Sequence, residues 1–194
     1  MYDYHILFAG LGITLELYAL YRYIHDIVLG TTKPHAFTWF AWFLINAIVA
    51  SAQIISGGGI GASVTVVVAF FCFSIFLAAL FHGEKDIKRS DWICFIGSLL
   101  AIALWTLTRN ALSAVAIVTF ADALAFVPTF RKAYSKPFEE TPTVWSVGVF
   151  RGICTIIALR SLTLVNWLYP GSLILTDGAF WLLLFVRRRQ LDRP

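Results

Sequence analysis

Apolar residues occur in seven long runs along the chain, and each run ends at a short polar or glycine-rich break such as Gly57-Gly58-Gly59. A helix needs about 20 residues to cross roughly 30 Å of hydrocarbon, and seven windows meet or approach that length. The windows cover residues 5–28, 35–56, 61–82, 92–108, 111–133, 143–163 and 166–186. This pattern predicts an all-α membrane protein with seven transmembrane helices and no separately folded soluble domain.

Composition supports a membrane location. Of the 194 residues, 59% are hydrophobic and only 13% are charged, whereas an ordinary globular domain carries roughly a quarter charged residues. A water-soluble fold of this size could not bury so much apolar surface. The first apolar run lacks a basic flank and is too long for a signal peptide, so we expect it to remain as a membrane helix.

The basic residues predict an orientation, because cytoplasmic loops of membrane proteins retain lysine and arginine. With the N-terminus outside and the C-terminus inside, twelve of the fifteen basic residues fall on the cytoplasmic side. These are Arg22, Lys33, Lys85, Lys88, Arg89, Arg131, Lys132, Lys136, Arg187, Arg188, Arg189 and Arg193, the last four in a basic tail over residues 187–194. Arg109 is then external, and Arg151 and Arg160 fall in the sixth window. The net charge of +4 is therefore a signal of topology, and nucleic-acid binding is not predicted.

A short pattern occurs in both halves of the chain. It consists of Lys33-Pro34 followed by Thr38-Trp39, and of Lys136-Pro137 followed by Thr143 and Trp145. The window before each copy carries one acid, Glu16 or Asp122, and the two acids align if a gap of about three residues is allowed.

This repetition predicts two three-helix repeats, residues 5–82 and 111–186, joined by a connector helix at 92–108. A three-helix unit that begins outside ends inside, so a second copy in the same orientation requires one extra crossing. Parallel repeats of this kind are known among transporters. The predicted fold is a single transmembrane domain with a 3+1+3 arrangement.

Several polar residues lie near the middle of their predicted helices, where an ionised side chain costs at least ~2.5–3.5 kcal/mol. They are Glu16, Asn46, Asp122, Arg151 and Asp177, from five different windows. Their shared depth predicts a solute site between the helices. The excess of acids over arginine suits protons or a cationic solute, or a neutral, hydrogen-bonded Glu16. The alternative is static packing, with Arg151 paired to Asp122 or Asp177 and Asn46 bonded between helices.

The tryptophans of the second window and the proline of the fifth each have two interpretations. Trp39 and Trp42 lie one turn apart, where they either pack or stack on a ligand and close a gate. Pro128 is expected to kink its helix, as a hinge or as a fixed bend.

A GxxxG spacing, Gly148 and Gly152 beside Arg151, favours close approach of the sixth helix to a neighbour. Aromatic residues near window ends predict an interfacial belt; these are Tyr2, Tyr4, Trp92, Trp167 and Tyr169.

No motif indicates catalysis, a metal or a cofactor. The chain lacks a glycine-rich phosphate loop, a GxSxG elbow and an HExxH pair. His25, His35 and His82 are expected at the surface, although their convergence on a metal is left open. The sequence therefore predicts no enzyme, no cofactor and no metal site.

The stretch from Asp122 to Glu140, followed by Trp145, resembles the PQ-loop element of the SWEET, PQ-loop and KDEL-receptor superfamily. In that element a Pro-Gln pair precedes a basic residue, a hydroxyl residue and an acid. The matching residues are Pro128, Lys132, Ser135, and Glu139 or Glu140. Thr129 replaces the glutamine, and the first repeat lacks the proline, with Tyr21 and Arg22 in that region. The Trp39-x-x-Trp42 pair is also similar to one in nicotinamide riboside transporters.

The resemblance implies a 3+1+3 fold with the N-terminus outside, and two helix bundles that rock around a midplane site with prolines as hinges. The predicted function is a small-solute transporter, either a uniporter or a proton-coupled carrier. Arg151 would hold an anionic or polar group, one acid would take the coupling proton, and Trp39 would stack or gate. The alternative is a receptor or accessory protein that binds a ligand without moving it, as the KDEL-receptor branch implies. The expected partners of the protein are the lipid bilayer and a small polar solute, with protons as a possible further partner. Homo-oligomerisation is left open.

Overall fold

The structure, a computed structural model, describes residues 3–105, 107 and 111–191. These residues form seven α-helices and one short 3-10 helix. The helices are α1 (Tyr4–Val28), α2 (Ala36–Ile55), α3 (Gly61–His82), α4 (Arg89–Trp105), α5 (Ala111–Ser135), α6 (Pro142–Ala158) and α7 (Leu164–Leu191), with the 3-10 helix η1 at Pro137–Glu139. The all-α prediction and the seven predicted helical segments are confirmed within these residues.

The predicted boundaries are least accurate in the last third of the chain. The sixth helix ends at Ala158 rather than at residue 163, and Arg160 lies in the following loop, exposed and paired with Asp3 at 2.8 Å. The prediction that Arg160 falls within the sixth helix is therefore wrong. The last helix continues past residue 186 to Leu191, through arginines, which favour helix. Arg109 and Tyr2 lie outside the described residues.

Four helices are long and apolar enough to cross a membrane, namely α1, α2, α3 and α7, and α6 is apolar but shorter. Large apolar side chains are exposed on the outside of the bundle, including Leu7, Phe70, Phe81, Phe150 and Leu175. Water-soluble monomers rarely expose apolar surface on this scale. The chain is therefore a membrane protein.

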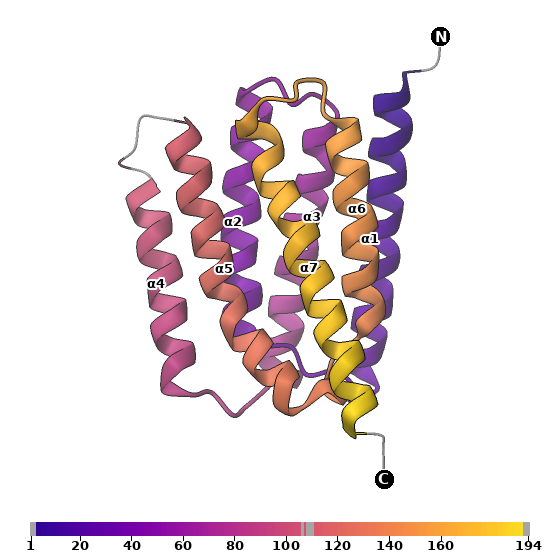
Figure 1. Ribbon diagram of the computed structural model, residues 1–194, viewed down its shortest axis with the longest axis vertical. Coiled ribbons are helices and arrows are strands. Elements are labelled where there is room, and N and C mark those ends of the chain that lie inside the picture. The colour runs from indigo at the N-terminus through magenta and orange to yellow at the C-terminus, as the bar shows by residue number, and fades with distance from the viewer. Residues whose placement is uncertain (1–2, 106, 108–110, 192–194) are drawn as a thin grey trace.

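Six helices form a closed ring, and the remaining helix, α4, packs against the outside of that ring. Going round the ring, α1 contacts α3, α3 contacts α2, and α2 contacts α5. The ring continues from α5 to α7 and α6, and α6 returns to α1. The remaining helix, α4, packs on α5 and touches α2, so that it lies at one edge of the bundle with α1 at the opposite edge (Figure 1).

Three glycines allow helices to approach closely. A Cβ added at Gly152 would lie 2.6 Å from Ile174 Cγ1, and one at Gly148 would overlap the Asp177 carboxylate. The GxxxG spacing therefore does bring α6 against α7, as predicted. A Cβ added at Gly61 would lie 2.9 Å from the backbone carbonyl of Ala158, so this glycine brings the start of α3 against the end of α6.

We expect Gly61→Ala to lower the stability of the protein by about 1–3 kcal/mol, because the new methyl group meets backbone that cannot rotate away. Gly10→Ala is the matched control, since a Cβ at Gly10 meets nothing within 4 Å. It should leave stability unchanged or slightly raised. Thermal unfolding in detergent micelles measures both, and equal melting temperatures for the two variants would contradict the close contact.

Candidate functional site

A small cavity lies halfway along the bundle, inside the ring of six helices. It has a volume of about 50 Å³, room for only a few water molecules. Its polar lining consists of Glu16 from α1, Asn46 from α2, Asp122 from α5, Arg151 from α6, and Tyr169 and Asp177 from α7. Trp39 also lines it, so every predicted solute-site residue borders this one space. Pro128, the predicted hinge, is buried in an unbroken α5 and is not part of the lining.

Arg151 is the central charge of the cavity. Its Nε lies 3.3 Å from Glu16 Oε2, and its Nη2 lies 3.4 Å from Asp177 Oδ2. All three side chains are less than a tenth exposed. Tight ion pairs of this type have N···O distances of about 2.7–2.9 Å, so both acids hold the guanidinium loosely. The packing alternative predicted that Arg151 pairs with Asp122 or Asp177. Arg151 does pair with Asp177, but its second partner is Glu16.

The third acid, Asp122, has a different partner. Tyr169 donates its hydroxyl hydrogen to Asp122 Oδ1 at 3.2 Å. Tyr169 is only 1% exposed, so its predicted place in an interfacial aromatic belt is wrong. The residue lies near the start of α7 as expected, but its side chain points into the interior of the ring, where it lines the cavity. Sequence position alone gives no sign of that rotation.

Aromatic rings close the cavity toward the end of the bundle that carries most of the basic residues. Trp39 packs edge-on against Trp42, with ring centroids 5.1 Å apart, and Trp42 in turn contacts Phe126 and Trp145. Phe180 covers Trp145 from α7, with centroids 4.3 Å apart. Trp145 was not among the predicted lining residues, although it holds the same place in the second copy of the Lys-Pro, Thr, Trp pattern as Trp39 does in the first.

Besides Nε of Arg151, three polar atoms at the cavity have no hydrogen-bond partner among the described residues. They are the indole Nε1 of Trp42, the indole Nε1 of Trp145 and the amide Oδ1 of Asn46. An enclosed polar group without a hydrogen bond costs about 1–3 kcal/mol. A bound solute with two acceptors and a donor, or water, would satisfy all three atoms. The cavity thus has unused hydrogen-bonding capacity as well as charge.

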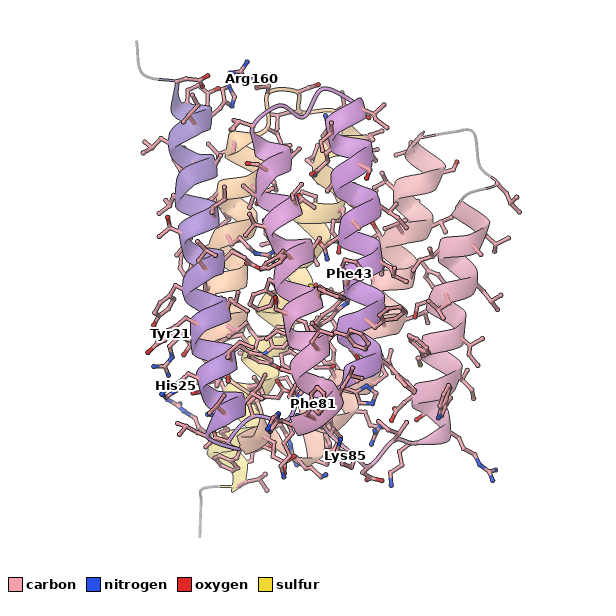
Figure 2. The ribbon with its side chains drawn as sticks, turned by 180° about the vertical axis from the view of Figure 1, so that it is seen from behind. Tyr21, His25, Phe43, Phe81, Lys85 and Arg160 are labelled. Atoms are coloured by element: carbon pink, nitrogen blue, oxygen red, sulfur yellow. The ribbon has the colours of Figure 1, made fainter. Side chains whose placement is uncertain are left out.

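Beyond the aromatic rings, the basic end is held together by ion pairs, most of which join segments that are distant in the sequence. Figure 2 shows His25 and Lys85 toward this end and Arg160 at the other. The pairs are Lys33–Glu139, Lys136–Glu84, Arg131–Asp91 and Lys132–Glu140, with N···O distances of 2.6–2.9 Å. These short distances make this end of the bundle a tightly bonded barrier.

Lys132 is the most enclosed cation of these pairs. Its side chain and that of Glu140 are each 1% exposed, and they lie 2.7 Å apart. The ammonium group also donates to the backbone carbonyls of Lys33 and Glu139, while Tyr23 donates to the Glu140 carboxylate at 3.1 Å. Lys132 therefore joins the loop after α1 to the loop after α5.

His35 lies in the same barrier and contradicts its predicted surface position. It is 1% exposed, because it precedes α2 where α4 covers it, and its Nε2 is 3.4 Å from Asp91 Oδ2. Burial lowers the pKa of His35, and the charge of Asp91 opposes that shift. Within the described residues, no three His, Cys, Asp or Glu side chains are grouped so that they could hold a metal ion.

The opposite end of the cavity is closed by neutral polar groups. Thr65 donates to the side-chain oxygen of Gln53 at 2.7 Å, and Gln53 donates to the backbone carbonyl of Asn166 at 3.3 Å. All three residues are buried. Neutral hydrogen bonds are roughly half as strong as charge-assisted ones, so the two ends of the cavity are closed by barriers of different strength.

Comparison with known proteins does not add to this geometry: no protein family, curated protein or solved structure matches the chain.

We expect Lys132→Met to destabilise the protein by about 3–5 kcal/mol, because the Glu140 carboxylate would be left buried without its cation. The double variant Lys132→Met/Glu140→Gln should regain part of that loss. Lys85→Met is the control, since the Lys85 side chain is exposed and its ammonium group donates to the backbone carbonyl of Leu80. Thermal unfolding would contradict the importance of the pair if Lys132→Met and Lys85→Met melted at the same temperature.

Glu84 gives the barrier a dependence on pH. Burial opposes its ionisation, but hydrogen bonds from Lys136 and from the backbone N–H of Asp86 outweigh burial and lower its pKa from 4.5 to about 2. A depressed pKa stabilises the folded protein above pH 4.5, and that contribution is lost as the pH falls toward 2.

Glu84→Gln should therefore be less stable than the wild type at neutral pH, and the gap should narrow between pH 4.5 and pH 2. Chemical unfolding measured across this range checks the trend. Asp86→Asn, an exposed substitution in the same loop, should have a small effect at neutral pH. A gap for Glu84→Gln that stayed constant with pH would contradict the assignment.

Proposed function

We propose that this protein is a small-solute membrane transporter that works by alternating access, as a uniporter or a proton-coupled carrier. One observation carries the proposal: charged side chains from both halves of the chain line a single cavity halfway along the bundle. Ionisable groups at membrane depth are expensive and face cavities where solutes or protons pass. Packing alone does not require one acid from α1, one from α5 and one from α7 to border the same space.

The order of the helices in the ring supports a 3+1+3 arrangement. Reading α1, α3, α2 and then α5, α7, α6 gives the same sequence of positions twice. Such an order is expected of two parallel repeats related by an axis along the membrane normal. In this arrangement α4 is the connector that restores the orientation of the second repeat, and it lies outside the ring.

The distribution of charge supports an orientation with the basic end in the cytoplasm. The chain then begins outside and ends inside. The barrier of ion pairs and aromatic rings is the cytoplasmic gate, and the neutral cluster around Gln53 is the external one. The resemblance to the PQ-loop superfamily agrees with this reading, since Lys132 and Glu140, which match that element, meet in the cytoplasmic gate. Pro128 is its proposed hinge.

The size of the cavity indicates which step the structure represents. A space of about 50 Å³ is too small for a metabolite, because even one water molecule needs roughly 10–15 Å³ of such space. Ion pairs and packed rings lie at one end of it, and the hydrogen-bonded Gln53 cluster lies at the other. The two halves must therefore separate on one side before a solute enters, as alternating access requires.

The proposal assigns roles to the charged and aromatic residues that line the cavity. Arg151 binds an anionic or polar group of the solute, since its two acids hold it only loosely. Asp122, whose hydrogen-bond partner among the described residues is the Tyr169 hydroxyl, takes the coupling proton or the cationic part of the solute. Trp39 stacks on the solute or gates it. The indole N–H groups of Trp42 and Trp145 and the amide oxygen of Asn46, which have no hydrogen-bond partner among the described residues, fit a polar solute.

The test begins with a thermal-shift screen of sugars, amino acids, nucleosides and vitamins against the purified protein. A compound that raises the melting temperature is then used for counterflow into proteoliposomes. We expect Asp122→Asn to abolish uptake while the protein still inserts and folds, because the variant keeps the shape of the side chain but not its charge. Asp86→Asn, in an exposed loop, is the matched control and should transport normally.

Two outcomes would contradict the proposal. Unchanged uptake by Asp122→Asn would remove this residue from the mechanism. A compound that binds in the cavity but shows no counterflow in either direction would favour the receptor function instead.

A further inference from the structure

A second pocket opens at the basic end of the bundle, between the ends of α1 and α7 and the start of α6. It has a volume of about 390 Å³, and its polar lining includes Arg22, Asp26, Thr32, Thr141, Thr143 and Arg188. We propose that this pocket binds the phosphate group of an anionic phospholipid in the leaflet at the basic end. The inference does not depend on the transport function.

Arg22 is the main reason for the proposal. Its Nε is enclosed without a hydrogen bond, and the guanidinium forms no ion pair or hydrogen bond with any residue that the structure describes. A guanidinium offers five N–H donors in a rigid fork that fits phosphate oxygens. A partly buried arginine without a protein partner, at the edge of an open pocket, therefore indicates an anionic ligand.

Arg188 supplies a second guanidinium, which the protein holds in place. Its Nε donates to the carbonyl of Pro137 at 3.0 Å and its Nη2 to the carbonyl of Glu140 at 2.6 Å. The group lies over the ring of Phe138, 5.3 Å from its centroid. This fixed cation borders the same pocket as Arg22, so a phosphate between them would meet positive charge from α1 and from α7.

The acids of the pocket do not cancel this charge. Glu140 is already neutralised by Lys132, 2.7 Å away. Asp26 accepts a hydrogen bond from Thr141 at 2.8 Å and lies 3.4 Å from His25. Neither acid forms an ion pair with Arg22 among the described residues, and the threonine hydroxyls add neutral donors.

The surroundings favour a lipid over a soluble anion. On α6, Phe150 lies two turns from Thr143 on the same face, and 62% of its surface is exposed. On α1, the exposed Tyr18 lies one turn from Arg22. An acyl chain can therefore run along apolar side chains from a headgroup held in the pocket. Arg187, Arg188 and Arg189 at the end of α7 add attraction to an anionic leaflet.

Native mass spectrometry of the detergent-purified protein tests the proposal, with phosphatidylglycerol and phosphatidylcholine as competing probes. We expect the wild type to retain phosphatidylglycerol in preference. Arg22→Gln should lower the affinity for phosphatidylglycerol about fivefold, the equivalent of ~1 kcal/mol, because it removes a directed contact between guanidinium and phosphate. Arg22→Lys, which keeps the charge, should lose less. Arg89→Gln is the matched control, an exposed arginine at the same end without a partner among the described residues.

Three results would overturn the proposal. The first is equal retention of the two lipids by the wild type. The second is an equal loss in Arg22→Gln and Arg89→Gln, which would show only general attraction to basic residues. The third comes from lipid-free protein: if inorganic phosphate raised its melting temperature in an Arg22-dependent way and phosphatidylglycerol did not, the ligand would be a soluble phosphate.

Discussion

The whole bundle depends on keeping the charge of Arg151 in surroundings of low polarity. An unpaired guanidinium there would be very costly, and the protein meets that cost with Glu16 from α1 and Asp177 from α7. The first helix, α1, is thereby joined to α6 and α7, which are distant from it in the sequence. Gly148 leaves the space that the Asp177 carboxylate fills. Because both ion pairs are longer than tight pairs, the same contacts that join the helices leave the arginine available to a ligand.

The two ends of the cavity are closed by different chemistry, and this difference bears on how each could open. At the basic end, charge-assisted bonds such as Lys132–Glu140 lie below a layer of packed indole and phenyl rings. At the other end, Gln53, Thr65 and Asn166 form a few neutral hydrogen bonds. Neutral bonds are replaced by water at little net cost. In the proposed cycle the external side therefore opens more easily in the absence of solute.

Arginines of this chain have different functions although the side chain is the same. Arg151 is held between acids inside the bundle, whereas Arg188 is fixed by backbone carbonyls at its surface. Arg22 has no partner among the described residues. The guanidinium stays charged in every environment, so its surroundings alone determine whether it supports structure or remains available for a ligand.

The sequence by itself determined the helices and the depth of their polar residues. Apolar runs must form helices in lipid, and a fixed rise per residue sets the height of each side chain. Rotation about each helix axis and contacts between distant segments depend on packing, which no local pattern encodes. Tyr169 therefore turned out to be buried beside the cavity, and His35 beneath α4. Only the tertiary structure decided that Lys132 is enclosed, because its partners are Glu140 and carbonyls of two separate loops.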